Sequence, residues 1–175
     1  RRSTLASVVT PSPKVAADNI SKNSVVVASG GGRGVTAACL ITLAKAKQPR
    51  IVLLGRTALA DEPQDLRAFA DDAGLKRALL QRAQAQGLKP TPADINTQIA
   101  NVLALREIRA TLAALQASGS EARYLAVDVA DTGALSAALD SVRKDWGPIT
   151  ALVHGAGVLA DKRIEEKTDA QFDRV

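Results

Sequence analysis

The stretch that decides the fold reads SVVVASGGGRGVT and spans residues 24–36. Its first half holds a β-branched run at residues 25–27, of the kind found in strands that are buried on both faces. Glycines crowd the second half, and Ala, Leu and Ile then recur at helical spacing over residues 35–47. We therefore predict a strand, a glycine-rich turn and a helix, in that order.

The same alternation continues along the chain. Apolar runs of strand length follow at residues 50–55, 122–127 and 149–153. A helix with its N-cap at Asp131 or Thr132 separates the last two runs. Buried strands that alternate with helices are typical of an α/β fold. We predict a Rossmann-like parallel sheet, of which these are the first four strands, with helices on both faces.

The connection between the second and third strands is long enough to hold structure of its own. Residues 58–118 carry seven acidic and seven basic residues, a balance typical of a solvated helical insertion. Two helices are predicted in it, one that ends near Gly87 and one over residues 93–116. The apolar positions of the second helix follow steps of three and four: Ile95, Ile99, Val102, Leu105, Ile108, Leu112 and Leu115.

Both ends of the chain differ from this pattern. Residues 1–22 contain two prolines and no periodicity, so we predict a linker there and a domain over residues 23–175. Thr168 and Gln171 have the spacing of a capping box that opens a last helix. Because the sequence begins without methionine and stops as this helix opens, we expect a piece of a longer protein, truncated on the C-terminal side. An open four-stranded sheet leaves an edge and an apolar face uncovered, through which the segment would form a homodimer or aggregate.

Composition and charge exclude several classes of protein. The 175 residues are 46% apolar and contain neither a membrane-spanning run nor a secretory signal, so we expect a cytoplasmic protein with no membrane partner. One cysteine, Cys39, and one histidine, His154, cannot form a usual zinc site, so no metal is expected. Cys39 is expected in the core. Residues 1–23 carry four basic and one acidic residue, +3 of the net +5, and aromatic side chains are few, which speaks against nucleic-acid binding.

Functional residues are expected where strands end, because parallel sheets bind ligands at the carboxyl ends of their strands. The glycine-rich turn lets the backbone approach a pyrophosphate, and the helix after it offers unpaired N–H groups. A dinucleotide is the expected ligand, although such turns also occur for purely conformational reasons. No Lys-Ser or Lys-Thr follows the last glycine, which excludes a P-loop. The candidate residues are Ser29, Gly30, Gly31, Gly32, Arg33, Gly34 and Val35.

Arg56 and Thr57 follow the second strand, where side-chain chemistry selects the cofactor. An acidic residue there binds ribose hydroxyls, and a basic residue accommodates a 2′-phosphate. The planar guanidinium of Arg56 suits a phosphate, and Arg33 is expected nearby. The pattern favours NADP(H) over NAD(H) and speaks against a methyltransferase, which normally has a carboxylate at this place. The alternative is that Arg56 is only a solvated cation at a strand end.

The ends of the third and fourth strands supply the remaining candidates. These are Asp128, Val129, His154, Gly155, Ala156 and Gly157. Asp128 lies where an adenine edge is met, and it serves equally well as a cap of the following loop. The small residues at 155–157 suit a backbone that lies against a cofactor, or an ordinary tight turn. His154 fits a packed or hydrogen-bonded residue better than a catalyst.

Taken together, these motifs resemble the short-chain dehydrogenase/reductase superfamily. Within it they are most similar to the ketoreductase domains of type I polyketide synthases and of multidomain polyunsaturated fatty acid synthases. The resemblance rests on SGGGRG at 29–34, GRT at 55–57, DV at 128–129 and VHGAGVL at 153–159. The helical insertion and the phrase REIRA at 106–110 resemble the second group.

The resemblance implies an enzyme that uses NADPH to reduce a β-ketoacyl group to the β-hydroxyacyl thioester. The substrate would be carried by an acyl carrier protein, and the partners would be other domains of the same synthase. Residues 30–35 would hold the pyrophosphate, Arg56 with Thr57 the 2′-phosphate, Asp128 with Val129 the adenine, and residues 154–157 the ribose.

The family's catalytic tyrosine, lysine and serine lie beyond the fourth strand. Tyr124, the one tyrosine, lies within the third predicted strand and does not match that role. We therefore expect residues 23–175 to be the NADP-binding part of a ketoreductase, with no catalytic residue and no turnover in this segment alone. The alternative function is a non-catalytic Rossmann-like module that orders neighbouring domains.

Overall fold

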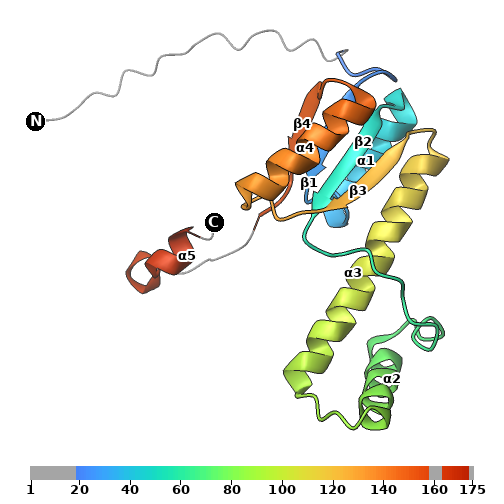
Figure 1. Ribbon diagram of the computed structural model, residues 1–175, viewed down its shortest axis with the longest axis vertical. Coiled ribbons are helices and arrows are strands. Elements are labelled where there is room, and N and C mark those ends of the chain that lie inside the picture. Colours follow the sequence, from blue (N-terminus) through green and yellow to red (C-terminus); the bar gives the residue numbers. More distant parts are fainter. Residues whose placement is uncertain (1–18, 158–162, 174–175) are drawn as a thin grey trace, which may run out of the picture.

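The computed structural model describes residues 19–157 and 163–173, and its centre is a parallel sheet with the strand order β3-β2-β1-β4 (Figure 1). The strands are β1 (Val25–Ser29), β2 (Arg50–Gly55), β3 (Ala122–Ala126) and β4 (Ala151–His154). The predicted parallel α/β sheet is confirmed. Strand β4 begins two residues later than predicted. At Thr150 the backbone N–H donates to the Val25 carbonyl oxygen, and the Thr150 hydroxyl, not a backbone carbonyl, accepts the Val25 N–H at 2.9 Å.

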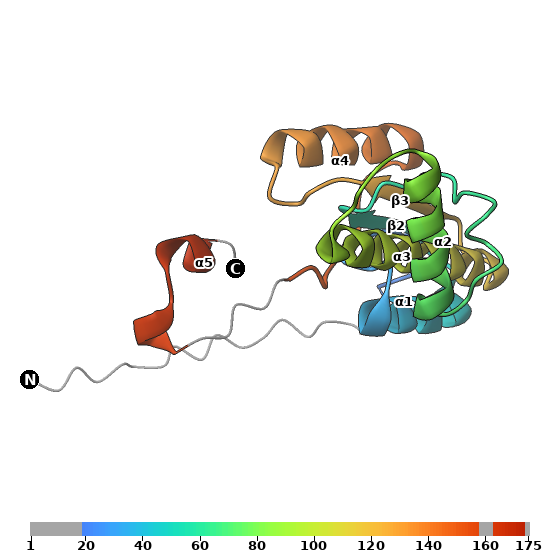
Figure 2. The same cartoon turned by 90° about the horizontal axis from the view of Figure 1, so that it is seen from below.

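Helices cover both faces of the sheet, as predicted (Figure 2). Helix α1 (Gly34–Lys47) and the C-terminal half of α3 (Pro92–Ala117) pack on one face, and α4 (Thr132–Trp146) packs on the other. Side chains alternate accordingly along β1, where Val26 contacts the first pair of helices and Val25 the cluster beneath α4. The central strands β1 and β2 are therefore buried on both sides, which explains their continuous apolar runs, whereas the edge strands β3 and β4 are partly exposed.

Helix α3 is longer than a crossover to β3 requires. Its C-terminal half lies against the sheet, whereas its N-terminal half extends past the sheet and carries α2 (Asp72–Ala85), as Figure 1 shows. A capping box between Thr91 and Asp94 starts α3, and these hydrogen bonds from Thr91 hold the pKa of the Asp94 carboxyl below its usual value. The single long helix is thus confirmed. It packs against α2 with one half and against the sheet with the other.

The apolar stripe predicted for α3 is only partly right. Five of its seven members are buried, but Leu105 and Leu112 are only half-buried, while Ala104 and Thr111 are buried in addition. The stripe shifts because the two halves of the helix pack against different partners, first α2 and then the sheet with α1. Cys39 is likewise exposed and does not lie in the core. It lies two residues from the buried Ala37, on the other side of α1.

Two predictions concern the chain ends. The linker predicted over residues 1–22 lies outside the described residues except for its last four, 19–22. The capping box at Thr168 is confirmed, because Thr168 and Gln171 exchange backbone to side-chain hydrogen bonds at the start of α5 (Asp169–Asp173), after the 3₁₀ turn η1 (Ile164–Glu166). Within the part of the chain that the structure describes, no helix is both long and apolar enough to cross a bilayer.

A buried ion pair attaches the segment that connects β2 with α2 to helix α3. Glu62 is buried, and its Oε1 accepts hydrogen bonds from Nε and Nη2 of Arg106 at 3.1 and 2.6 Å. The same guanidinium donates to the carbonyl oxygens of Phe69 and Leu66 at 2.7 and 2.8 Å. Four hydrogen bonds from one arginine therefore hold residues 62–69 against the middle of α3.

Replacing Arg106 by methionine will lower the free energy of unfolding of the insertion by about 3 kcal/mol, because Glu62 is left as a buried charge without its partner. The measurement is amide hydrogen exchange of α2 together with denaturant unfolding. Arg109→Ala is the control, since Arg109 pairs with a fully exposed Asp61 and its loss is worth at most about 1 kcal/mol. Equal effects of the two substitutions would contradict the assigned role of Arg106.

Candidate functional site

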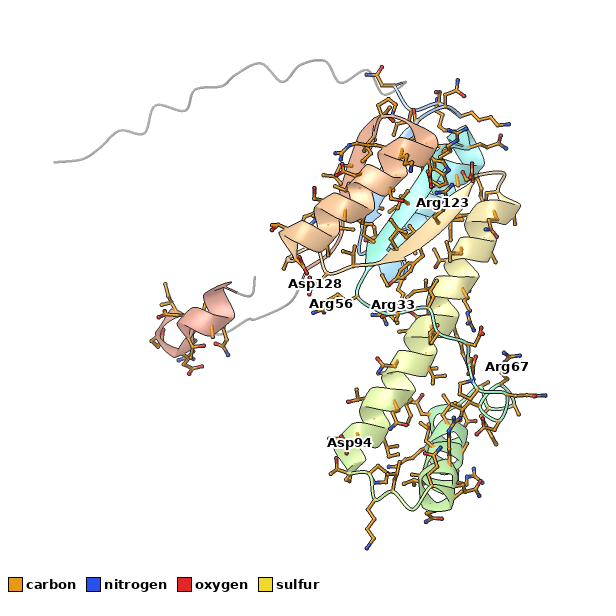
Figure 3. All side chains as sticks on the ribbon, in the orientation of Figure 1. Arg33, Arg56, Arg67, Asp94, Arg123 and Asp128 are labelled. Atoms are coloured by element: carbon orange, nitrogen blue, oxygen red, sulfur yellow. The ribbon has the colours of Figure 1, made fainter. Side chains whose placement is uncertain are left out.

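A cavity of about 800 Å³ opens at the carboxyl ends of all four strands. Twelve of the fifteen predicted site residues line it: Gly30, Gly32, Arg33, Gly34, Arg56, Thr57, Asp128, Val129, His154, Gly155, Ala156 and Gly157. They come from four loops that are far apart in the sequence, and the parallel sheet brings them to one edge. Figure 3 shows Arg33, Arg56 and Asp128 at this end of the sheet. A volume of this size suits a ligand as large as a dinucleotide.

The loop after β1 leads into a helix N-terminus without a side-chain cap. Arg33 occupies the N-cap position of α1, and its side chain accepts no hydrogen bond from the first turn. The N–H groups of that turn are therefore available to an anion, and the helix dipole favours one there. Gly34 has φ +62°, and no atom of the residues that the structure describes lies within 4 Å of a Cβ built on it, so open space lies beside the start of the helix.

Gly30 brings the loops after β1 and β4 into contact. It has φ +68°, and a Cβ built on it would lie 2.6 Å from the Ala156 nitrogen and from the Gly155 oxygen. Both neighbours are backbone atoms, which cannot move aside as the end of a side chain can. Only glycine therefore fits here. Because the two loops touch at this point, they form one continuous surface, which is the floor of the cavity.

Three predicted residues do not line the cavity. Ser29 is buried beneath it, where its Oγ lies 2.7 Å from Nδ1 of His154 and accepts the Ala156 N–H at 3.4 Å. Gly31 faces the core, since a Cβ there would lie 2.7 Å from Leu40. Val35 is 81% exposed on α1. Ser29 therefore links the loops after β1 and β4 from below the cavity. His154 makes a hydrogen bond here, as predicted from the sequence.

Positive charge at the cavity comes from Arg33 and Arg56. Arg56 is exposed and makes no hydrogen bond or ion pair with any other described residue. Arg33 is half-exposed, and its Nε lies 4.0 Å from Oε2 of Glu107. Asp128 lines the cavity and also caps its own loop, because its Oδ1 accepts the Ala130 N–H at 3.0 Å. The site thus holds one unpaired guanidinium at its mouth, next to a loop rich in glycine.

Sequence reasoning missed seven lining residues, which come from the end of β2, from α3, and from β3 with the loop after it. The added residues are Leu54, Gly55, Glu107, Ile108, Tyr124, Val127 and Ala130. Ile108 belongs to the predicted apolar stripe, but no pattern marks it as the point where α3 passes the strand ends. Its Cγ1 would lie 3.0 Å from a Cβ on Gly32.

Tyr124 is the most distinctive of the missed residues. Its hydroxyl would lie 2.7 Å from a Cβ on Gly55, so this glycine leaves room for the phenol. Burial raises the pKa of the Tyr124 hydroxyl above its usual value of 10, while hydrogen bonds with Thr57 and the charge of Arg33 act in the opposite direction. The phenol therefore stays protonated and lies on β3, at the opposite edge of the sheet from β4.

Comparison with known proteins finds relatives among multidomain synthases. A polyunsaturated fatty acid synthase polypeptide of Thraustochytrium sp. is 34% identical over 164 residues, which cover 89% of this chain and 6% of that protein. A reducing polyketide synthase of Cochliobolus heterostrophus is 45% identical over 60 residues, 34% of this chain and 2% of that protein. The chain thus spans only a small part of the curated relatives that it matches.

Solved structures share the fold. An N-terminal ketoreductase from a macrolactin assembly line aligns with a TM-score of 0.58 and 21% identity over 89% of this chain and 23% of that one. Carveol dehydrogenase from Mycobacterium avium, in complex with NAD, aligns with a TM-score of 0.55 and 19% identity over 86% of this chain and 42% of that one. The model of the KR domain family matches residues 24–175, almost all of the chain after the predicted linker. The chain belongs to the KR domain family, the ketoreductases of polyketide and polyunsaturated fatty acid synthases within the short-chain dehydrogenase/reductase fold.

Proposed function

We propose that this chain is the NADPH-binding part of a β-ketoacyl reductase in a multidomain polyketide or polyunsaturated fatty acid synthase. The reaction would convert a β-keto thioester into the β-hydroxyacyl thioester. The substrate would arrive on an acyl carrier protein, and the other partners would be domains of the same cytoplasmic synthase. Membership of the KR family supports the class of reaction, and the curated relatives that match the chain are synthases of these two kinds.

The observation that carries the proposal is the unpaired Arg56 at the end of β2. A guanidinium without a protein partner is free to accept a phosphate through its planar pair of donors. Arg33 lies on the same cavity and adds a second positive charge. An NAD site would have a carboxylate at this position to bind the ribose hydroxyls, and the chain has none at 55–57.

The residues present fit the whole dinucleotide. The uncapped N-terminus of α1 beside Gly34 would hold the pyrophosphate, and Arg56 with Thr57 the 2′-phosphate. The loop at 155–157 would lie against the ribose on the β4 side. Bound there, NADPH would supply a hydride to the keto carbon of the substrate. Ser29 would keep the floor beneath it rigid through its contact with His154.

Reduction of the keto group also needs a proton donor for the alkoxide, and Tyr124 does not suit that role. Tyr124 lies on the β3 edge, beside Thr57 and Arg33, at the end of the cavity that we assign to the 2′-phosphate. Its raised pKa and this position do not suit a proton donor to a substrate on the β4 side. We place the donor among the family's tyrosine, lysine and serine residues, outside these 175 residues.

Cofactor titration tests the proposal directly. Followed by the fluorescence of the reduced nicotinamide, the 175-residue chain is expected to bind NADPH at least tenfold more tightly than NADH, because only NADPH engages the two arginines. The same chain is expected to oxidise no NADPH when a β-ketoacyl thioester is added. Equal affinity for both cofactors would refute the NADPH assignment, and steady turnover would refute the placement of the proton donor.

A further inference from the structure

A carboxylate lines the cavity that we assign to the cofactor. Glu107, on α3, lines the cavity together with Arg33 and Arg56. Its Oε2 lies 4.0 Å from Nε of Arg33, and Arg33 is the one ionic partner of Glu107 among the described residues. Asp128, the other acidic residue of the lining, instead accepts a hydrogen bond from its own loop. Glu107 is therefore the carboxylate of the lining that pairs with an arginine of the proposed phosphate site, Arg33.

The neighbours of Glu107 on α3 fix its position. Arg106 is held by Glu62 and by two carbonyl oxygens of the insertion. Ile108 packs at Gly32, in the loop after β1. The backbone of Glu107 is thus anchored on both sides, once to the insertion and once to the loop after β1. These contacts hold this part of α3 beside the cavity, where the Glu107 carboxylate reaches Arg33.

We propose that Glu107 is a specificity-determining residue that competes with the cofactor's 2′-phosphate for Arg33. This inference rests on the proposed function. When a 2′-phosphate enters, Arg33 leaves Glu107 for the phosphate, and Glu107 repels the incoming charge. A cofactor with a free 2′-hydroxyl brings no such charge and is not affected. Glu107 therefore lowers the preference for NADPH that Arg33 and Arg56 create.

The test compares two nucleotide probes that differ only in the 2′-phosphate. Adenosine 2′,5′-bisphosphate carries the 2′-phosphate, and adenosine 5′-phosphate lacks it. By titration calorimetry on the whole protein, Glu107→Gln is expected to bind the bisphosphate about three- to tenfold more tightly than the wild type, with no change for the monophosphate. Raising the ionic strength is expected to shrink the difference, because both charged groups are partly exposed.

Asp140→Asn is the matched control. Asp140 also pairs with an arginine, Arg143 at 2.8 Å, but it lies on the surface of α4 and does not line the cavity. The substitution removes the same charge and is expected to change the binding of neither probe. A gain for the bisphosphate as large as that of Glu107→Gln would reduce the effect to net charge and overturn the inference.

A double substitution separates competition from simple repulsion. In an Arg33→Gln background, Glu107→Gln is expected to give a smaller gain, since no guanidinium is left to release. Equal gains in both backgrounds would overturn the competition. If the wild type prefers the bisphosphate but Glu107→Gln brings no gain, this inference fails and the proposed function stands. If the wild type binds both probes equally, the proposed function fails and takes this inference with it.

Discussion

Replacing Arg56 by alanine will weaken the binding of NADPH roughly tenfold to hundredfold and leave the binding of NADH unchanged. A hydrogen bond to a charged group contributes about 1.5–3 kcal/mol, and the 2′-phosphate has no other unpaired guanidinium at the end of β2. The effect is selective because NADH carries a hydroxyl where NADPH carries the phosphate. No folding defect is expected, since Arg56 is exposed and contacts no other described side chain through a hydrogen bond or ion pair.

The measurement is a fluorescence titration with each cofactor. Arg77→Ala is the control, because Arg77 is an exposed arginine of α2 that does not line the cavity. It removes the same charge and is expected to leave both affinities as they are. A parallel loss of NADPH and NADH affinity in Arg56→Ala would mean that Arg56 supports the fold of the site and not the 2′-phosphate.

Replacing Gly30 by alanine will lower the free energy of unfolding by about 3 kcal/mol or more. Two costs add up at this position. The backbone has φ +68°, which a residue with a Cβ rarely adopts, and the new Cβ would collide with backbone atoms of Gly155 and Ala156. Relief requires the loop after β4 to move away from the loop after β1, so cofactor binding is expected to be lost as well.

Two glycines of the same site separate these costs in thermal or denaturant unfolding. Gly34→Ala has a similar φ of +62° but open space around the new Cβ, so it is expected to cost only about 1 kcal/mol. Gly157→Ala meets no atom of the described residues within 4 Å and has no unusual φ, so its stability is expected to equal that of the wild type. If Gly30→Ala unfolds like Gly34→Ala, the contact between the two loops does not contribute to stability.

Much of the fold was predictable because strands and turns have local signatures. The β-branched run before Gly30 and the apolar run at residues 50–55 can be buried only as central strands, and each recurs with its predicted bounds to within two residues. The sheet then places every strand-end loop at the same edge. That rule alone located most of the cavity lining, including Arg56 and the residues at 154–157.

The rest depended on tertiary contacts that have no local signature. Glu107 lines the cavity because α3 passes the strand ends, and Tyr124 lines it because β3 pairs with β2 and places the phenol beside Gly55. From composition alone, Glu107 was one of the seven acidic residues that balance seven basic residues in a solvated insertion. Cys39 shows the reverse error, because an apolar neighbourhood in the sequence does not say which side of a helix meets the sheet.

The unbroken course of α3 restricts how this region of the chain can change in length. Each residue of an α-helix turns the chain by about 100°, so a one-residue deletion between Arg106 and Leu115 would rotate the outer half of α3 against the inner half. Ile95 and Ile99 would then turn away from α2, or Leu115 away from the sheet. Single-residue insertions and deletions are therefore better tolerated in the loop between α2 and α3 than within α3 itself.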